Sequence, residues 1–156
     1  MTLPKSPAER VRDMVLGDHR RLRVLLNTLA RETSALQKGE PDAAQQVCEV
    51  LGDLCDTLQL HLDYEDRELV PILRDANAWG QVVASRVREE HRVQRTVISA
   101  LADDPADRCS KRTDAFIEEL GAFIRWLEQD MQMEEATLLT DSALGEGYVV
   151  IDQNAG

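Results

Sequence analysis

Aromatic residues are scarce in this chain, where Phe, Trp and Tyr make up 4% of 156 residues. The abundant residues are Leu, Ala, Arg, Glu and Asp, which are nearly all compatible with helices. The chain is 43% hydrophobic and 30% charged, and its length is that of one domain with a core of its own. The composition therefore predicts a single all-α domain.

Cysteine is also sparse, with only Cys48, Cys55 and Cys109 and no CxxC spacing. An odd number without that spacing argues against a disulfide framework and against a thiolate zinc site. Seven helical residues separate Cys48 from Cys55 by about 10 Å, which is too far for a disulfide. We expect three reduced thiols packed in the domain.

Long apolar runs are missing as well, so the sequence predicts neither a signal peptide nor a membrane span. We expect a cytoplasmic protein with no membrane partner. The formal charge is -11 and the isoelectric point lies near 4.7. Most of the surface would repel a polyanion, so nucleic acid is not an expected partner.

Helix start and stop signals divide the chain into four long helices. Ser6-Pro7-Ala8-Glu9 combines an N-cap serine, a proline at the first helical position and a glutamate placed for a capping box. Pro71 should kink or end the second helix, and Asn77 should cap the third. The predicted helices cover about 7–37, 41–71, 78–102 and 105–140.

Short connections between long helices favour antiparallel neighbours. The expected fold is an up-down-up-down antiparallel four-helix bundle over residues 1–140. Residues 141–156 are expected to form a C-terminal tail, whose apolar patch at 148–151 is suited to docking on the bundle or on a partner.

Polar residues fall on the apolar stripe of each predicted helix, where stripe positions are three and four residues apart. The stripes read Val15, His19, Leu22, Leu26 and Leu29; Leu51, Leu54, Leu58, His61 and Glu65; Ala84, Val87, His91, Gln94, Ile98 and Leu101; and Phe116, Leu120, Phe123, Leu127, Asp130, Glu134 and Leu138. All three histidines of the chain therefore face the predicted core. Chance alone does not favour this coincidence.

Two stripes carry a pair of polar residues one helical turn apart, His61 with Glu65 and Asp130 with Glu134. A carboxylate left unpaired in a bundle core costs several kcal/mol or takes up a proton, whereas a cation neutralises it. Imidazole and carboxylate without thiolate suit iron, manganese or zinc. Six such donors on four helices suit two ions, and one ion with spare donors is the alternative.

The series His19, His61-Leu62-Asp63-Tyr64-Glu65, His91 and Asp130-Met131-Gln132-Met133-Glu134 resembles the hemerythrin-like HHE cation-binding family. The resemblance covers nearly the whole chain. It implies a hemerythrin-like four-helix bundle that holds a non-haem di-iron centre, bridged by carboxylate and oxo groups. The metal ligands it implies are His19, His61, Glu65, His91, Asp130 and Glu134.

The chain departs from the family pattern at Asp130, because the fourth helix of the family normally supplies a histidine there. Aspartate is shorter and anionic, so the site should be harder and more negative. The change argues against reversible oxygen carriage. Residues next to the ligands are expected to be structural: Asp18, Glu90 and Glu135 solvated, Met131 and Met133 packed, and Tyr64 at the core boundary.

The resemblance implies a role in oxygen, nitric oxide or redox sensing, or in iron handling and defence against oxidants. A diatomic ligand, oxygen or nitric oxide, is the expected small-molecule partner, and a protein partner or a homodimer is compatible with the sequence. The alternative is a degenerate bundle, metal-free or with a single zinc, that acts as a protein-interaction module. An oxygen- or peroxide-reactive enzyme is the third reading, although no substrate pocket is marked outside the ligand set.

Overall fold

The computed structural model describes residues 4–111 and 113–146, which form helices and short connections without a strand. The elements are α1 (Pro7–Gln37), α2 (Ala43–Tyr64), the π-helical segment η1 (Glu65–Leu69), α3 (Val70–Ala76), α4 (Gly80–Leu101), α5 (Pro105–Lys111) and α6 (Asp114–Thr137). The all-α prediction is confirmed. Within these ranges, no helix combines the length and apolar character that crossing a membrane requires.

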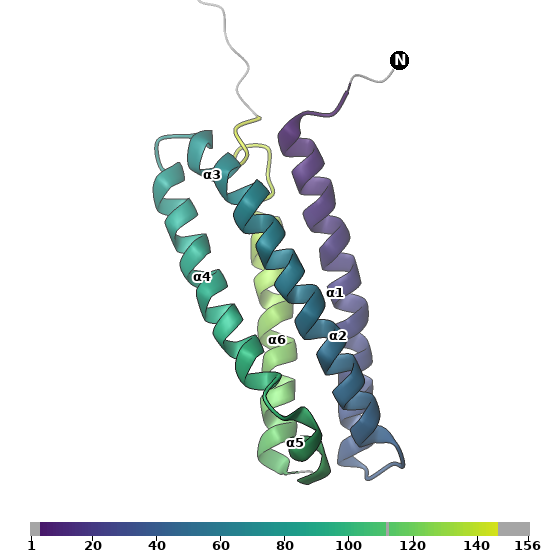
Figure 1. Cartoon of the computed structure of the whole chain (residues 1–156). Helices are drawn as coiled ribbons and strands as arrows, with labels where there is room; N and C mark the ends of the chain where they lie inside the picture. Colours follow the sequence, from purple (N-terminus) through teal and green to yellow (C-terminus); the bar gives the residue numbers. More distant parts are fainter. Residues whose placement is uncertain (1–3, 112, 147–156) are drawn as a thin grey trace, which may run out of the picture.

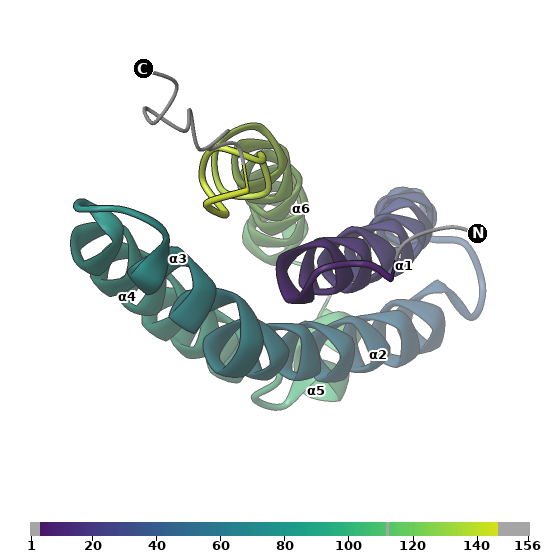
Figure 2. The ribbon, with the colours of Figure 1, turned by 90° about the horizontal axis from the view of Figure 1, so that it is seen from above.

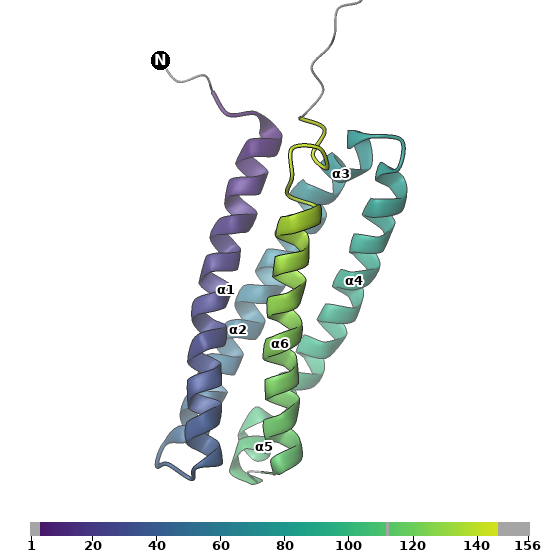
Figure 3. The same ribbon diagram turned by 180° about the vertical axis from the view of Figure 1, so that it is seen from behind.

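The long helices α1, α2, α4 and α6 lie lengthwise beside one another (Figure 1). Figure 3 shows α6 between α1 and α4 on the face opposite α2. Seen along the long axis, α2, α3 and α4 form an arc, and α1 and α6 close it (Figure 2). The α1–α2 connection and α5 lie at one end, and α3 lies at the other with the start of α1.

The predicted start of the first helix is confirmed at atomic detail. The Ser6 hydroxyl accepts a hydrogen bond from the Glu9 backbone N–H at 3.0 Å, and the Glu9 carboxylate accepts one from the Ser6 N–H at 2.7 Å. This capping box satisfies two backbone donors that a helix start leaves free. The helix ends at Gln37 as expected.

Pro71 does not interrupt the second helix as sharply as the sequence indicated. The helix passes through η1 into α3, and Pro71 lies in the first turn of α3. A proline lacks an N–H and collides with the carbonyl four residues earlier in an α-helix. The wider π turn immediately before Pro71 relieves this conflict, so the chain continues in helical form to Ala76.

The prediction of one uninterrupted fourth helix over 105–140 is wrong. The chain forms α5 up to Lys111 and begins α6 at Asp114, where the Thr113 hydroxyl accepts a hydrogen bond from the Phe116 N–H at 3.3 Å. Thr113 has extended backbone angles and acts as a new N-cap. The third helix also begins at Gly80 rather than Ala78.

Two apolar clusters form the core, and a polar layer separates them. The larger cluster runs from Leu22 and Leu62 toward α5, and the smaller one contains Val15, Leu69 and Leu138. Between them, each long helix places one or more buried polar residues. These residues are His19, His61, Glu65, His91, Gln94 and Glu134.

Residues 138–146 fold back over the end of the helices near α3. Leu144 is buried in the smaller cluster, Asp141 pairs with Arg12, and Glu146 accepts a hydrogen bond from the Ser6 hydroxyl. The first part of the predicted tail therefore packs on the domain. The apolar patch at 148–151 lies outside the described residues.

Replacing Gly80 with alanine should destabilise the fold, because an added Cβ would lie 2.2 Å from the Arg74 carbonyl oxygen and 2.4 Å from that of Leu73. We expect the free energy of unfolding to fall by about 1–3 kcal/mol, as in other overpacked sites. Urea denaturation would measure it. The control is Gly52→Ala in α2, where a Cβ meets nothing within 4 Å.

The control should raise the free energy of unfolding by about 0.5–1 kcal/mol, since alanine is the better helix former. Equal effects of the two substitutions would contradict the close approach of α4 to the end of α3.

Candidate metal centre

Four of the six ligands predicted from the sequence meet in the polar layer. His19 of α1, His61 of α2, Glu65 of η1 and Glu134 of α6 are all buried, and each places one ligand atom within 4.8 Å of the others. The Nε2 atom of His19 lies 3.1 Å from Oε2 of Glu134. Residues far apart in the sequence thus form one compact donor set of two nitrogens and two oxygens.

Glu65 occupies the middle of the layer and has no exposed surface. Its Oε1 lies 3.5 Å from Nε2 of His61, and its Oε2 lies 3.2 Å from Nε2 of His91. One carboxylate therefore faces imidazoles from two helices with different oxygens. This is the disposition that a bridging carboxylate requires.

His91 and Asp130 lie outside the compact set of four. His91 is buried and reaches the site through Glu65. Asp130 is half-buried, and one of its carboxylate oxygens accepts a hydrogen bond from the side-chain amide of Gln94. The structure brings four predicted ligands together and places His91 beside one of them, Glu65. It joins Asp130 to Gln94, a residue that the sequence analysis placed only in the core stripe.

The π-helical segment begins at Glu65 itself. A π turn inserts an extra residue into the helical register, and such turns occur frequently at functional sites. Here it directly precedes α3, whose first turn contains Pro71. Pro71 thus lies six residues after Glu65, which carries the central carboxylate.

Several buried polar atoms of this layer have no hydrogen-bond partner among the described residues. They are both carboxylate oxygens of Glu65, Nδ1 of His61, Nε2 of His91 and Oε1 of Gln94. Leaving such atoms unpaired costs about 1–3 kcal/mol each, and more for charged groups. A cation would use the lone pairs of Glu65 and of Nε2 of His91 and would neutralise Glu65, so the residues present fit a metal ion.

Carboxylates from neighbouring helices face the second nitrogen of each histidine. The Nδ1 of His19 lies 2.8 Å from Glu135, that of His91 lies 2.6 Å from Asp66, and that of His61 lies 3.6 Å from Asp18. Partners of this kind fix ring orientation and direct the other nitrogen toward a metal.

The expectation that Asp18 and Glu135 are solvated is therefore wrong, and Asp66 was missed. Each of these acids follows or precedes a ligand of its own helix and contacts the histidine of the next helix. Each acid is rotated by about 100° around its helix from the neighbouring ligand, so its side chain points away from that ligand atom. The same rotation points the side chain toward the adjacent helix. The available signal was an acidic residue next to His19, Glu65 and Glu134.

Arginines hold all three outer carboxylates. Arg23 donates to Glu135 at 2.7 Å, Arg95 donates to Asp66 at 2.8 Å, and Arg21 donates to Asp18 at 3.0 Å. Charge-assisted hydrogen bonds of this type restrict a carboxylate more than neutral ones do. Each of the three histidines thus lies beside a carboxylate that an arginine in turn holds.

The family model of the hemerythrin HHE cation binding domain matches residues 10–141 of the chain. The chain belongs to the hemerythrin HHE family. All six predicted ligands lie within the matched range. No curated protein and no solved structure matches the chain.

Burial and neighbouring charges in the HHE site shift the pKa values of His91, Asp130 and Glu134. Burial lowers the pKa of His91, but contact with Glu65 and Asp66 outweighs it and raises that pKa from 6.5 to about 9. Burial and the charge of Glu134 raise the pKa of Asp130 to about 6. Burial also raises the pKa of Glu134. Without a cation, protons neutralise part of the layer, and a metal must displace them.

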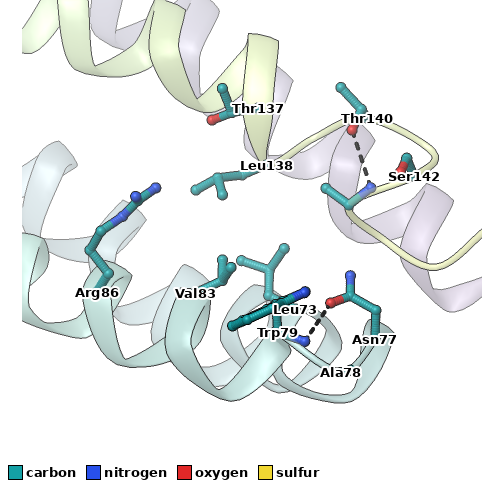
Figure 4. Close-up of a pocket in the computed structure, with 11 residues that line it drawn as sticks. Leu73, Asn77, Ala78, Trp79, Val83, Arg86, Thr137, Leu138, Thr140 and Ser142 are labelled. Atoms are coloured by element: carbon teal, nitrogen blue, oxygen red, sulfur yellow. Dashed lines mark hydrogen bonds between the residues drawn. The ribbon is translucent and has the colours of Figure 1, made fainter.

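Two residues beside the HHE ligands, Met131 and Tyr64, have the burial that the sequence analysis expected. Met131 is buried, and the half-buried ring of Tyr64 lies 5.7 Å from the Arg67 guanidinium. The expectation that Met133 is packed is wrong, because this residue is 62% exposed. A pocket of about 560 Å³ lies between the α3–α4 connection and the end of α6, and none of the six predicted ligands lines it. Figure 4 shows Trp79, Val83 and Leu138 around this pocket.

The metal-free domain should lose stability as the pH rises through the pKa of His91. Because the folded chain holds this proton more tightly than the unfolded chain, the contribution is complete below pH 6.5 and is lost by about pH 9. We expect a loss on the order of 3 kcal/mol in the free energy of unfolding. Urea denaturation of chelator-treated protein at several pH values would measure it.

The variant His91→Gln should show a much smaller loss over the same pH range, because the glutamine amide does not titrate. The same pH dependence in both proteins would mean that another group controls it.

The variant Glu135→Ala should bind metal about 10–100-fold more weakly, because His19 loses the carboxylate that orients it. Competition with a chromophoric chelator would measure the affinity. Gln132→Ala removes an exposed polar side chain from the same helix and should leave the affinity unchanged. Equal affinities of all three proteins would exclude an orienting role for Glu135.

Proposed function

We propose that this HHE domain holds a non-haem di-iron centre at His19, His61, Glu65, His91, Asp130 and Glu134. The observation that carries the proposal is the Glu65 carboxylate, which is fully buried, unpartnered at both oxygens and faced by imidazoles of two helices. A buried ionic group without compensation would destabilise the domain by several kcal/mol. A pair of cations resolves that cost and uses both oxygens.

Iron is the proposed metal because the donors are imidazole and carboxylate without thiolate. Zinc and manganese suit parts of the same donor set. When bound, iron with these ligands supplies one-electron and oxygen chemistry. The chain itself contributes the ligand orientation through Asp18, Asp66 and Glu135, and it encloses the layer between two apolar clusters that exclude bulk water.

The proposed role is the sensing of oxygen, nitric oxide or redox state, or the handling of iron and oxidants. A small ligand is favoured because five of the six proposed ligands are buried and His61 borders a surface pocket. This pocket has a volume of about 490 Å³ and includes Asp18 and Tyr64. A diatomic molecule could approach the layer there, whereas a large substrate could not reach Glu65.

The finer architecture is part of the same proposal. We infer an up-down-up-down antiparallel bundle over residues 1–140, in which α2, η1 and α3 together form the second helix and α6 forms the fourth. The remaining residues form the tail, and the protein acts in the cytoplasm. If the domain senses a ligand, a protein partner or a second copy of the chain would read the signal.

A single-metal site is the second candidate, and the compact set of four favours it. His19, His61, Glu65 and Glu134 offer two nitrogens and two oxygens, which suits one tetrahedral zinc ion. In that case the bundle would serve as a protein-interaction module. The metal content of the purified protein separates the two candidates.

Protein purified from iron-supplemented cells should contain about two irons per chain by elemental analysis and show near-ultraviolet charge-transfer absorption. His61→Ala should lose most of this iron, because it removes a buried nitrogen donor. Glu49→Ala, an exposed change on the same helix, should retain it. One zinc per chain would favour the second candidate, and no metal in any protein would refute both metal sites.

A further inference from the structure

Two of the three cysteines meet where α5 packs on α2, and the proposed metal ligands include neither of them. All three cysteines are free thiols. Cys48 of α2 is half-buried, and Cys109 of α5 is 1% exposed. Both lie against the larger apolar cluster, and the helices that carry them are in contact (Figure 2). The fold thus brings together two thiols that are far apart in the sequence.

A direct contact joins the two thiols across these helices. The Cys109 thiol donates a hydrogen bond to the sulfur of Cys48. Burial raises the pKa of Cys109 to about 12, and this hydrogen bond adds to the rise because only the protonated thiol can donate it. A disulfide bond is shorter than a hydrogen bond, so the two sulfur atoms need only a small further approach to become bonded.

The third cysteine, Cys55, lies apart from this pair. It follows Cys48 by seven residues on α2, which places the two residues about 10 Å apart along the helix. That separation is too long for a disulfide. Cys55 is buried, and burial raises its pKa to about 11. Cys55 therefore provides an internal control for the reactivity of the pair.

The helix that carries Cys109 is short and has ends of its own. α5 contains seven residues, and α6 begins after a separate N-cap at Thr113. A small shift of α5 toward α2 therefore need not move α6, which carries the proposed ligand Glu134. The approach of Cys109 to Cys48 is compatible with an intact polar layer.

We propose that Cys48 and Cys109 form a reversible disulfide site that exchanges with low-molecular-weight disulfides. The Cys48 thiol is the more accessible of the two, and its thiolate attacks the small disulfide, forms a mixed disulfide and releases one small thiol. Cys109 then loses its proton to solvent and attacks the Cys48 sulfur, which breaks the mixed disulfide and releases the second small thiol. The two protein thiols are oxidised, and the small disulfide is reduced to two thiols.

This site is independent of the metal centre and would add a second redox response to the domain. Disulfides in reducing compartments are usually transient and serve catalysis or redox sensing. A bond between Cys48 and Cys109 would fasten α5 to α2 and close a long loop of the chain. Closure of a long loop restricts the unfolded chain and so stabilises the folded one.

The test uses the full chain with its bound metal, incubated under native conditions with oxidised glutathione. Iodoacetamide then blocks the remaining thiols, and the protein is digested with trypsin without a reductant. Peptide 39–67 carries Cys48 and Cys55, whereas Cys109 lies in peptide 109–111. Mass spectrometry should find these two peptides linked, with two hydrogen atoms lost and Cys55 alkylated. Dithiothreitol should separate them.

Variants and an unfolded control assign the linkage. Cys48→Ala and Cys109→Ala should each abolish the linked peptides, whereas Cys55→Ala should retain them. Circular dichroism of each variant establishes that the fold is retained. In concentrated urea the parent chain should instead link Cys48 mainly to Cys55, because the shorter loop closes at a lower entropic cost.

A native chain that keeps three alkylated thiols would overturn the inference. Glutathione that stays on Cys48 without transfer to Cys109 would overturn it as well, and so would linkage between two chains alone. The same linkage pattern in native and in urea-unfolded protein would mean that the fold does not bring Cys48 and Cys109 together for reaction. None of these outcomes depends on the metal content of the domain.

Discussion

The burial of one carboxylate, that of Glu65, is the constraint on which the rest of the structure depends. Its charge lies where the two apolar clusters meet, so it must be compensated within the layer. The imidazoles of His61 and His91 lie beside its two oxygens and supply part of this compensation. Protons or cations must supply the remainder, which makes metal binding and domain stability parts of one equilibrium.

Two further sets of side chains surround the polar layer. The carboxylates Asp18, Asp66 and Glu135 face the outer nitrogens of the three histidines, and arginines in turn hold them. Each carboxylate belongs to a different helix from the histidine that it serves. The same contacts that orient the ligands therefore also link neighbouring helices, which couples assembly of the site to packing of the domain.

Much of this site could be predicted from periodicity. Because side chains three and four residues apart share a helical face, the stripe positions of His19, His61 and Glu134 already placed them in the core. The outer carboxylates could not be predicted in the same way, because they act on a neighbouring helix whose rotation the sequence does not specify. The pairing of Gln94 with Asp130 was missed for that reason too.

The sequence by itself determined the helical class, the first helix with its capping box, and the polar residues of the core stripes, since these depend on interactions between residues close along the chain. Only the tertiary structure decided the π turn at Glu65, the break before Thr113 and the separation of Asp130 from the compact ligand set. Those features result from competition between local helix preference and contacts with other helices, which one helix cannot reveal alone.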